Sequence, residues 1–377
     1  MRNSQRWLVT TALAIPLVLV AGCASGAPTD AGGETESSAP VAEGPYGGVV
    51  GTPEVEIALE ALYQEALDAG EDQVVVYGPP PPQDYLDAFM DRFPGIEIIY
   101  EQLQSQDRIT RLEAEKASGN YAGDVAQDGR TPVVNMGLGG WCEAVDPIVD
   151  VPSDLIGIDG TVFYPQATVF GVLINTDLLD PADAPRTWED LIDPKWKGKE
   201  VMVSPAAGGA GAFASAMLLT PEANAEQWGM KIVEGLKANV DTVAKDAQTV
   251  SSVVEGTYPI GVLAYYPYYF QTIKDVPNAP VEFILLDEGN TWSKGAQCKI
   301  VNAPHPHAAE LWLNWVFSDE GQNMLAETGA YPVMPGIGGP TGLPSADQAG
   351  LITLLSDEDA ITGYADYVKQ VQALYGG

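Results

Sequence analysis

The sequence predicts an α/β protein with a largely parallel sheet and two lobes. Short runs of β-branched residues, such as Val74-Val75-Val76, alternate along the chain with segments whose apolar residues recur at helical spacing. This alternation occurs once before and once after the apolar run at 169–174. Two α/β units in one chain predict two lobes with a ligand cleft between them.

The first unit begins with a helix that Pro53 opens and Gly70 ends, with Leu59 and Leu62 on its apolar face. The next run, 73–77, is continuously apolar or β-branched, which is typical of a strand buried on both faces. The remaining predicted elements of this unit are a helix at 84–93, a strand at 96–100, a helix at 106–118 and a strand at 123–126.

The second unit follows the crossing strand 169–174. Its predicted elements are a helix at 188–192, a strand at 201–203, helices at 211–219 and 226–236, strands at 260–264 and 281–286, and a long helix at 308–327. Thr187 has the character of an N-cap, and Ser318-Asp319-Glu320-Gly321 has the pattern of a cap and a helix restart.

The first 22 residues predict a secretory signal. Arg2 and Arg6 supply its positive end, residues 7–20 its apolar core, and Ala21-Gly22 a small-residue pair before Cys23. The match resembles the lipobox of bacterial lipoproteins, which implies that the chain is cut before Cys23 and that the sulfur of Cys23 carries a diacylglyceryl group. Cys23 is then a lipid anchor on the outer side of the cell membrane.

The alternatives for this segment are a membrane-spanning helix and an ordinary signal with an incidental cysteine. The apolar run is short for a span and is interrupted by Pro16. Residues 23–52 are rich in Gly, Ser, Pro and acidic residues, so the lipidated cysteine and a disordered tether are predicted there.

The composition limits the classes of partner. The chain has 377 residues, 46% of them hydrophobic, which is enough for a sizeable core. Its net charge is −34, from 18 basic and 52 acidic residues, and such a field argues against binding of nucleic acid or of anionic lipid surfaces. The charge does not identify a cationic substrate, because distant carboxylates are screened beyond about 8 Å in physiological salt.

Cys142 and Cys298 remain when Cys23 is acylated. Outside the cytoplasm such a pair is a disulfide candidate, but bridging requires Cα atoms within about 7 Å, which the sequence alone does not settle. A zinc site is not expected, because the chain has no further cysteine and no suitably placed histidine.

Several segments in a specific order resemble the extracytoplasmic solute-binding proteins of ABC importers, and within them the branch of ferric-iron-binding proteins. The segments include Val74-Val75-Val76-Tyr77, Phe93-Pro94-Gly95-Ile96, Glu115-Lys116-Ala117-Ser118-Gly119, Pro185-Arg186-Thr187-Trp188-Glu189-Asp190-Leu191, Glu255-Gly256 before Pro259-Ile260-Gly261, and Ser318-Asp319-Glu320-Gly321-Gln322.

The resemblance implies a periplasmic-binding-protein-like fold whose lobes close on a ligand by hinge bending. It implies lobe 1 at 53–169, lobe 2 at 170–287, and a return to lobe 1 with a C-terminal helical section at 288–377. Cys142 and Cys298 then lie in the same lobe, which favours the bridge. We expect a monomer that binds a small solute or metal ion, passes it to an ABC permease, and needs no cofactor.

Ligands of open α/β sheets bind at the carboxyl ends of strands. The first candidate segment is therefore Tyr265-Tyr266-Pro267-Tyr268-Tyr269, which follows a predicted strand. In the iron-binding branch paired tyrosines at this place bind ferric ion, which implies Tyr265 and Tyr266 as metal ligands if the solute is iron. The rings, Tyr268 included, could equally form an aromatic wall for an organic solute, and about two of them could serve only in packing.

The second candidate segment is the small-residue run after strand 201–203, with Ser204, Ala206, Gly208 and Gly209 as candidate ligand contacts. Backbone N–H groups at a helix N-terminus attract anions, and the resemblance implies a bound carbonate or phosphate, or a ligand carboxylate or phosphonate, at such a place. The alternative is close packing of the helix on the sheet through small side chains.

The third candidate segment is Tyr77-Gly78 with the prolines that follow, where iron-binding relatives often carry a histidine or an acid and this chain carries neither. That difference argues against ferric iron, although several relatives bind iron with tyrosines alone. The expected solute is therefore ferric iron or a small organic ligand such as a polyamine, thiamine or a phosphonate. Tyr164, Gln166 and Trp292 are weaker candidates for solute contacts.

The sequence argues against an enzyme. The two histidines lie in Pro304-His305-Pro306-His307, where the prolines favour a helix entry over a metal site. No nucleophile elbow, zinc-protease motif or phosphate-binding loop is present. We therefore expect a lipid-anchored solute-binding protein, with a secreted hydrolase or a sensory receptor on the same fold as the alternatives.

Overall fold

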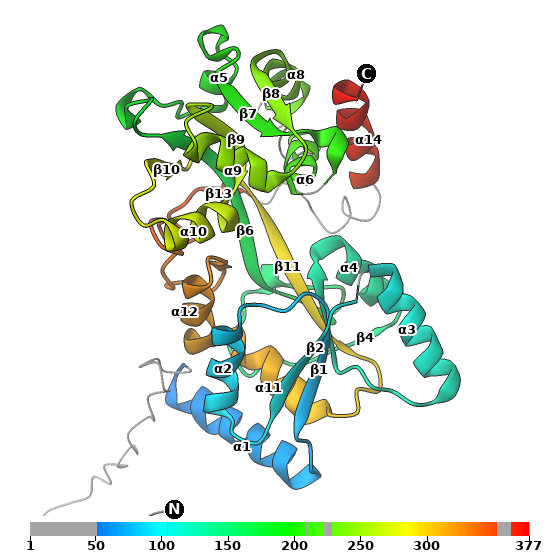
Figure 1. Ribbon diagram of the computed structural model, residues 1–377. Coiled ribbons are helices and arrows are strands. Elements are labelled where there is room, and N and C mark those ends of the chain that lie inside the picture. Colours follow the sequence, from blue (N-terminus) through cyan, green and yellow to red (C-terminus); the bar gives the residue numbers. More distant parts are fainter. Residues whose placement is uncertain are drawn as a thin grey trace, which may run out of the picture. The chain divides into compact units, whose positions relative to one another are not determined.

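The structure is a computed structural model that describes residues 51–103, 105–208, 210–221, 223, 228–352 and 363–376 (Figure 1). The predicted signal peptide, Cys23 and the tether up to residue 50 lie outside the described residues. Within the described residues, no helix is both long enough and apolar enough to cross a membrane.

The described helices lie at the following positions: α1 (Pro53–Ala69), α2 (Gln83–Arg92), α3 (Ser105–Ser118), α4 (Arg130–Leu138), α5 (Trp188–Leu191), α6 (Ala210–Met217), α8 (Gly229–Asn239), α9 (Asp246–Val254), α10 (Tyr266–Asp275), α11 (Pro306–Trp315), α12 (Asp319–Glu327) and α14 (Tyr364–Tyr375). The described strands are β1 (Gln73–Tyr77), β2 (Glu97–Glu101), β3 (Val125–Gly129), β4 (Cys142–Glu143), β5 (Ile156–Gly157), β6 (Val162–Asn175), β7 (Glu200–Val203), β8 (Val240–Val243), β9 (Ile260–Tyr265), β10 (Val281–Ile284), β11 (Asn290–Ile300), β12 (Tyr331–Pro332) and β13 (Leu351–Ile352).

The sheet confirms the predicted α/β class. Its main strands run in the order β2-β1-β3-β11-β6-β9-β7-β8. The group β2-β1-β3 is parallel, and so is the group β9-β7-β8. We call the parts built on these two groups the first and the second lobe. The long strands β11 and β6 pair antiparallel between the groups and run from one lobe to the other (Figure 1).

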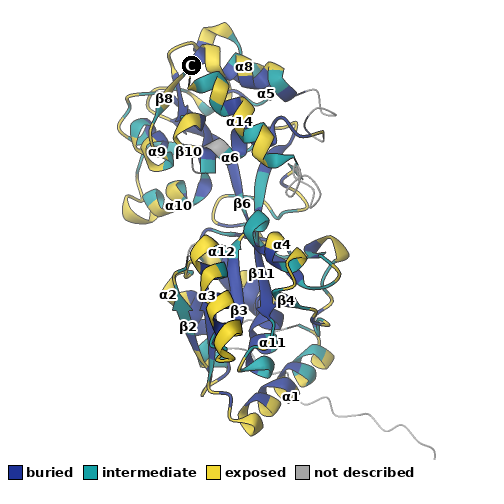
Figure 2. Ribbon diagram, turned by 90° about the vertical axis from the view of Figure 1, so that its right-hand side faces the viewer, coloured by how far each residue is buried: buried dark blue, intermediate teal, exposed yellow. Residues whose placement is uncertain are grey.

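Two hydrophobic cores lie on this sheet. The first takes its residues mainly from β1, β3, α1, α2 and α11. The second takes them mainly from β6, β9, α5, α6 and α8, and Val371 of α14 joins it. Both long strands are buried along most of their length (Figure 2). Val169 belongs to the first core and the next residue, Phe170, to the second.

Local signals set the helix ends. The side chain of Thr52 accepts a hydrogen bond from Val55 N, and Gly70 ends α1 with φ +76°, a conformation that favours glycine. Thr187 opens α5 with a capping box. The prediction of one long helix at 308–327 is wrong, because α11 ends at Trp315. The predicted cap is confirmed, since Ser318 Oγ accepts a hydrogen bond from Gly321 N at 3.1 Å and begins α12.

Several elements were not predicted from the pattern. Helices α4, α9, α10 and α14 were missed, and so was β11, whose sequence Asn-Thr-Trp-Ser-Lys-Gly-Ala-Gln-Cys-Lys-Ile has little of the composition of a strand. Pairing with β3 on one side and β6 on the other holds β11 extended. The helix predicted at 226–236 begins in the structure at Gly229 and continues to Asn239.

Cys142 and Cys298 are bridged in the structure. Cys142 of β4 and Cys298 of β11 form a disulfide across paired strands, with their Cα atoms 5.7 Å apart. The bridge joins residues 156 positions apart in the sequence, and both cysteines are buried in the first core. It therefore ties the segment after α4 to the crossing strand β11.

Glu200 gives the second lobe a pH dependence. It is fully buried at the start of β7, and neither carboxylate oxygen has a hydrogen-bond partner in the described part of the chain. Burial raises the pKa of Glu200 from 4.5 to about 9. The unfolded chain therefore releases this proton near pH 4.5, while the folded chain keeps it up to about pH 9, so the stability falls as the pH rises between these values.

We expect Glu200→Gln to remove this fall. At pH 7.5 the variant should be more stable than the wild type by on the order of 2 kcal/mol, and at pH 4 the two should unfold alike. Urea unfolding at the two pH values measures the difference, with Glu234→Gln, an exposed position on α8, as the control. Equal pH dependence in the wild type and Glu200→Gln would contradict the assignment.

Candidate functional site

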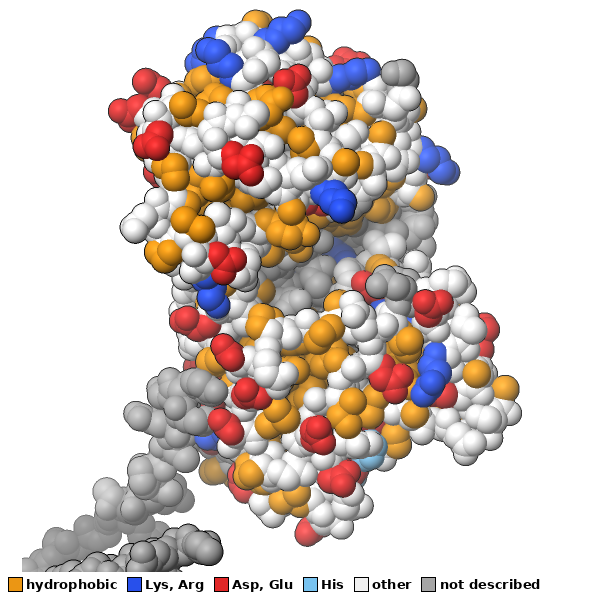
Figure 3. Space-filling model, in the orientation of Figure 1, with side chains coloured by type: hydrophobic (Ala, Val, Ile, Leu, Met, Phe, Trp, Pro, Cys, Tyr) orange, Lys and Arg blue, Asp and Glu red, His pale blue; other side chains and the backbone are white. Residues whose placement is uncertain are grey.

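A cleft of about 540 Å³ lies against the two crossing strands and takes residues from both lobes. The surface is hollowed between the lobes, with hydrophobic side chains along both margins of the hollow (Figure 3). The lining residues are Pro79, Gln127, Asp128, Gly129, Gln166, Thr168, Phe170, Ala210, Phe213, Tyr265, Ser293, Lys294 and Gly295. Aromatic rings, amides, hydroxyls and two charged groups thus face one space.

All three candidate segments of the sequence reach this cleft. Pro79 follows β1, Ala210 begins the helix after β7, and Tyr265 ends β9. Their meeting follows the rule that ligands of α/β sheets bind beyond the carboxyl ends of the strands. The carboxyl end of β3, from Gln127 to Gly129, also reaches the cleft, and the same rule would have found it.

Tyr265 is the tyrosine of the cluster that lines the cleft. Its ring lies 5.3 Å from that of Phe170 and 5.7 Å from that of Tyr268, measured between centroids. Burial raises the pKa of the Tyr265 hydroxyl, a hydrogen bond with Thr168 acts in the opposite direction, and the nearby Tyr268 and Asp246 raise it further. Tyr268 is 43% exposed beside this ring.

Tyr266 lies elsewhere, so the expected pair of Tyr265 and Tyr266 as ligands does not form in this structure. Helix α10 begins at Tyr266 and turns its ring into the first core, where the side chain is 1% exposed. Its hydroxyl donates a hydrogen bond to Thr341 O at 2.5 Å, and its ring packs against Phe283. The two rings part because Tyr265 is the last, extended residue of β9, where successive side chains point to opposite sides, and Tyr266 is the first residue of α10.

The helix N-terminus predicted to receive an anion already holds one from the protein. Asp246, the first residue of α9, accepts hydrogen bonds from Ala210 N at 3.2 Å and from Gly211 N at 2.8 Å. A Cβ on Gly211 would stand 1.7 Å from Cγ1 of Val203, so this glycine serves the close packing of α6 on β7. The alternative of close helix-to-sheet packing therefore fits this segment.

The other residues of the small-residue run lie outside the cleft lining. Ser204 precedes the 3₁₀ turn Pro205–Ala207, and its N–H donates to Val243 O. Ala206 is exposed and lies near Gly376 at the end of α14, and Gly208 closes the turn with φ +79°. Gly209 lies outside the described residues.

Tyr77 has a structural role, in contrast to its expected place in the site. It is fully buried, its hydroxyl donates a hydrogen bond to Glu115 Oε1 at 2.5 Å, and burial raises the pKa of the hydroxyl well above its ordinary value. Gly78 allows its backbone to lie close to that of Gln127, since a Cβ at Gly78 would stand 2.1 Å from Gln127 O. Gln127 Nε2 in turn donates to Pro79 O at 2.9 Å, which fixes the rim of the cleft.

The crossing strands supply the remaining polar lining. Gln166 and Thr168 come from β6, and Ser293 and Lys294 from β11. No pattern in the sequence distinguishes Thr168, Ser293 and Lys294, because their position depends on the pairing of two strands more than a hundred residues apart. Of the weaker candidates, Gln166 lines the cleft, whereas Tyr164 is buried and Trp292 is half-buried, neither of them in the lining.

The charged groups of the first lobe at the cleft are paired. Arg108 is fully buried, and its Nη2 lies 2.6 Å from Asp128 Oδ2. Lys294 Nζ lies 3.4 Å from Asp154 Oδ2, and over the rings of Tyr164 and Trp292 at 5.9 and 5.5 Å. These pairs hold the strand ends in place and reduce the net charge that the first lobe presents to the cleft.

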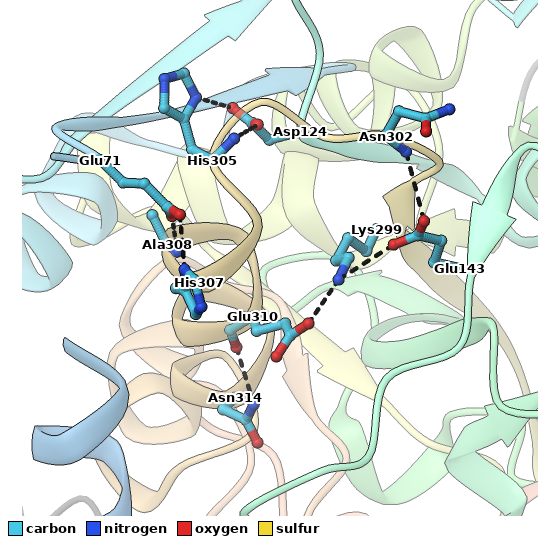
Figure 4. Close-up of polar contacts among 10 residues, drawn as sticks. All are labelled: Glu71, Asp124, Glu143, Lys299, Asn302, His305, His307, Ala308, Glu310 and Asn314. Carbon is cyan, nitrogen blue, oxygen red and sulfur yellow. Dashed lines mark hydrogen bonds and ion pairs between the residues drawn. The ribbon is translucent and has the colours of Figure 1, made fainter. Parts of the chain in front are cut away.

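The two histidines form no site with each other. His305 Nδ1 lies 2.9 Å from Asp124 Oδ2, and His307 Nδ1 lies 2.7 Å from Glu71 Oε1 (Figure 4). Both carboxylates also accept backbone N–H groups at the start of α11, so the pairs fasten this helix to the first lobe. In the described part of the chain, no group of three His, Cys, Asp or Glu residues is placed to hold a metal ion.

A second hollow, of about 590 Å³, lies between α2, α10 and α12. It is lined by residues such as Asp84, Phe270 and Met324, and Pro82 is the one residue of the three candidate segments in its described lining. Because it lies away from the carboxyl ends of the central strands, we assign the solute site to the cleft at Tyr265.

Comparisons with known proteins agree with this fold. The family described as "Bacterial extracellular solute-binding protein" matches residues 84–349. An Fe(3+)-binding periplasmic protein of Serratia marcescens is 24% identical over 177 residues, which cover 46% of this chain and 51% of that protein. The chain thus spans about half the length of the curated relatives it matches.

Two solved structures share the fold. Iron-bound HitA of Pseudomonas aeruginosa has a TM-score of 0.63 at 20% identity, covering 81% of this chain and 99% of HitA. AfuA of Actinobacillus pleuropneumoniae, with fructose-6-phosphate bound, has a TM-score of 0.57 at 19% identity, covering 80% of this chain and 97% of AfuA. Proteins of this fold therefore hold ligands as different as a metal ion and a sugar phosphate.

We expect Gly78→Ala to disturb the cleft rim. The new methyl group would meet the Gln127 carbonyl, which is backbone and cannot rotate away, so the variant should lose about 1–3 kcal/mol of stability and bind solute more weakly. Thermal unfolding and calorimetric titration measure the two effects. Gly338→Ala, where the added carbon has open space, is the control. A Gly78→Ala protein as stable as this control would show that the rim adjusts freely.

Proposed function

The chain belongs to the bacterial extracellular solute-binding protein family, and we propose that it is the lipid-anchored solute-capturing subunit of an ABC-type importer. It takes up a small organic solute in the cleft at Tyr265 and delivers it to a membrane permease driven by a separate ATPase. The observation that carries the proposal is the cleft itself, because strand ends of both lobes line it.

Capture in such a cleft requires no catalysis. A solute that contacts both lobes binds the closed form more tightly than the open form, and this difference in affinity drives closure. The permease then recognises the closed form. A hydrolase, one of the alternatives, would need a nucleophile with a base, and the described lining contains hydroxyls but no histidine or cysteine. A sensory receptor would capture the solute in the same way and differ in its membrane partner.

The lining favours an organic solute over a bare ferric ion. A hard trivalent cation needs several anionic oxygens, and here Tyr266 is committed to Thr341, while Asp128 is paired with Arg108. Burial also raises the pKa of the Tyr265 hydroxyl, which opposes formation of its phenolate. Rings such as those of Phe170 and Phe213, together with amides and hydroxyls, suit a small molecule with an apolar body and polar ends.

Ferric iron is the second candidate, favoured by the iron-binding name of the Serratia relative. A ferric ion bound by tyrosine phenolate gives a visible charge-transfer band. Addition of ferric citrate to the apo-protein tests this directly. If the solute is organic, no band should appear. A band that appears in the wild type and is lost in Tyr265→Phe would show that the solute is ferric iron.

We expect Tyr265→Ala to weaken solute binding at least tenfold, because the ring forms one wall of the cleft beside Phe170. The purified chain without its signal is titrated with spermidine, thiamine, 2-aminoethylphosphonate and ferric citrate, and the tightest binder is carried into the variants. Tyr269→Phe, on the helix that follows, is the control, because Tyr269 packs against Phe283 in the core. Unchanged affinity in Tyr265→Ala would move the site elsewhere.

The anchor is proposed from Cys23 alone, which lies outside the described residues. We expect the full-length chain, made in a bacterial host supplied with a labelled fatty acid, to carry the label and to sediment with membranes. Cys23→Ala should abolish both, and Ser25→Ala, in the adjoining tether, should change neither. Label retained in Cys23→Ala would place the acyl group at another residue or show that the segment is an ordinary signal.

A further inference from the structure

The N-terminus of α6 is occupied by a carboxylate of the chain itself. Asp246 Oδ1 and Oδ2 accept the N–H groups of Gly211 and Ala210, which no turn of α6 satisfies. The partial positive charge of a helix N-terminus normally stabilises an anion at this position. Here α9 supplies that anion across 35 residues of sequence.

This carboxylate lies directly behind the lining of the cleft, in contact with Ala210. Ala210, one of its two partners, lines the cleft, and its charge is close enough to the Tyr265 hydroxyl to contribute to the raised pKa of that group. A carboxylate has about four acceptor positions, and the helix uses two of them. The half-buried Asp246 thus keeps acceptor capacity beside Tyr265.

We propose that Asp246 sets the charge class of the solute: the cleft receives a cationic amine group beside Tyr265 and Ala210, in front of Asp246, and it rejects phosphate, phosphonate and carboxylate groups there. The proposal rests on solute capture in this cleft. An anionic group of a solute would have to displace Asp246 from two N–H groups or lie against its negative charge, and both cost free energy.

The neighbouring rings fit the same class of solute. Tyr265 lies between Phe170 and Tyr268, with centroid distances of 5.3 and 5.7 Å, so three rings form one cluster on the side of the cleft where Tyr265 stands. An ammonium group is attracted to ring faces as well as to a carboxylate, and its alkyl chain packs against the rings. Aromatic and acidic groups together are the surroundings that organic cations favour.

The other charged side chains at the cleft do not neutralise the negative charge of Asp246. Asp128 is matched by Arg108, and Lys294 by Asp154, each within the first lobe. The contacts of Asp246 are with backbone N–H groups, whose helix carries only about half a unit of opposing charge. The wall of the second lobe therefore keeps a negative field toward the cleft.

The test compares cationic and anionic probes on the purified chain. Spermidine, thiamine and a panel of primary and quaternary alkylamines are titrated by calorimetry beside inorganic phosphate and fructose 6-phosphate. We expect the wild type to bind at least one amine and neither anion. Asp246→Ala should bind that amine at least tenfold more weakly and gain phosphate binding that weakens with added salt, because it frees the two N–H groups. Asp246→Asn should lose amine affinity while retaining the shape of the side chain.

The control is Asp241→Asn, which removes the same charge from β8, where Asp241 accepts a hydrogen bond from the Tyr258 hydroxyl at 2.9 Å. It should leave amine affinity unchanged, and thermal unfolding checks that all variants fold. The charge assignment would be overturned if the wild type bound no amine of the panel. It would also be overturned if the wild type bound either anion as tightly as Asp246→Ala does.

The proposed function fails in a different way. If an anion binds and Tyr265→Ala abolishes its binding, solute capture in the cleft stands and the role of Asp246 falls. If both Tyr265→Ala and Asp246→Ala bind an amine as tightly as the wild type does, the cleft is not the site. The proposed function then fails together with the inference.

Discussion

The antiparallel pairing of β6 with β11 is the constraint on which the rest of the structure depends. The two strands are paired from Trp292 and Val169 to Gln297 and Phe163, and they are the strands that run between the lobes. Because neighbouring residues of β6 enter different cores, neither lobe folds around its own segment alone. The register of this pair fixes where every other strand begins and ends.

The cleft is a consequence of that pairing. Its floor consists of Gln166 and Thr168 on one strand and Ser293 and Lys294 on the other. Its walls are the end of β3 and the segment after β1 in the first lobe, and the start of α6 and the end of β9 in the second. Side chains on a paired strand have few rotamers and little freedom to move. The floor is therefore rigid, and a change in the opening of the cleft has to come from bending of these two strands.

The periodicity of the sequence predicted the two α/β units, because buried parallel strands such as Val74–Tyr77 are continuously apolar and helices such as α1 carry explicit caps. The rule of strand ends then brought three segments to one cleft. It failed within the tyrosine cluster, since the direction of Tyr266 depends on the exact residue at which α10 begins. The rule of strand ends also does not predict Thr168 and Ser293 as lining residues, because their position is set by the pairing of distant strands.

The anion expected at α6 illustrates a limit of a different kind. A strand followed by small residues and a helix predicts free N–H groups, but whether they await a ligand depends on side chains elsewhere in the chain. Asp246 supplies the carboxylate from the start of another helix. The net charge of −34 gave no guidance here, because most of those carboxylates lie beyond the screening length from the cleft. One carboxylate in contact with the lining outweighs many distant ones, so the solute's charge has to be judged from the local contacts of the cleft.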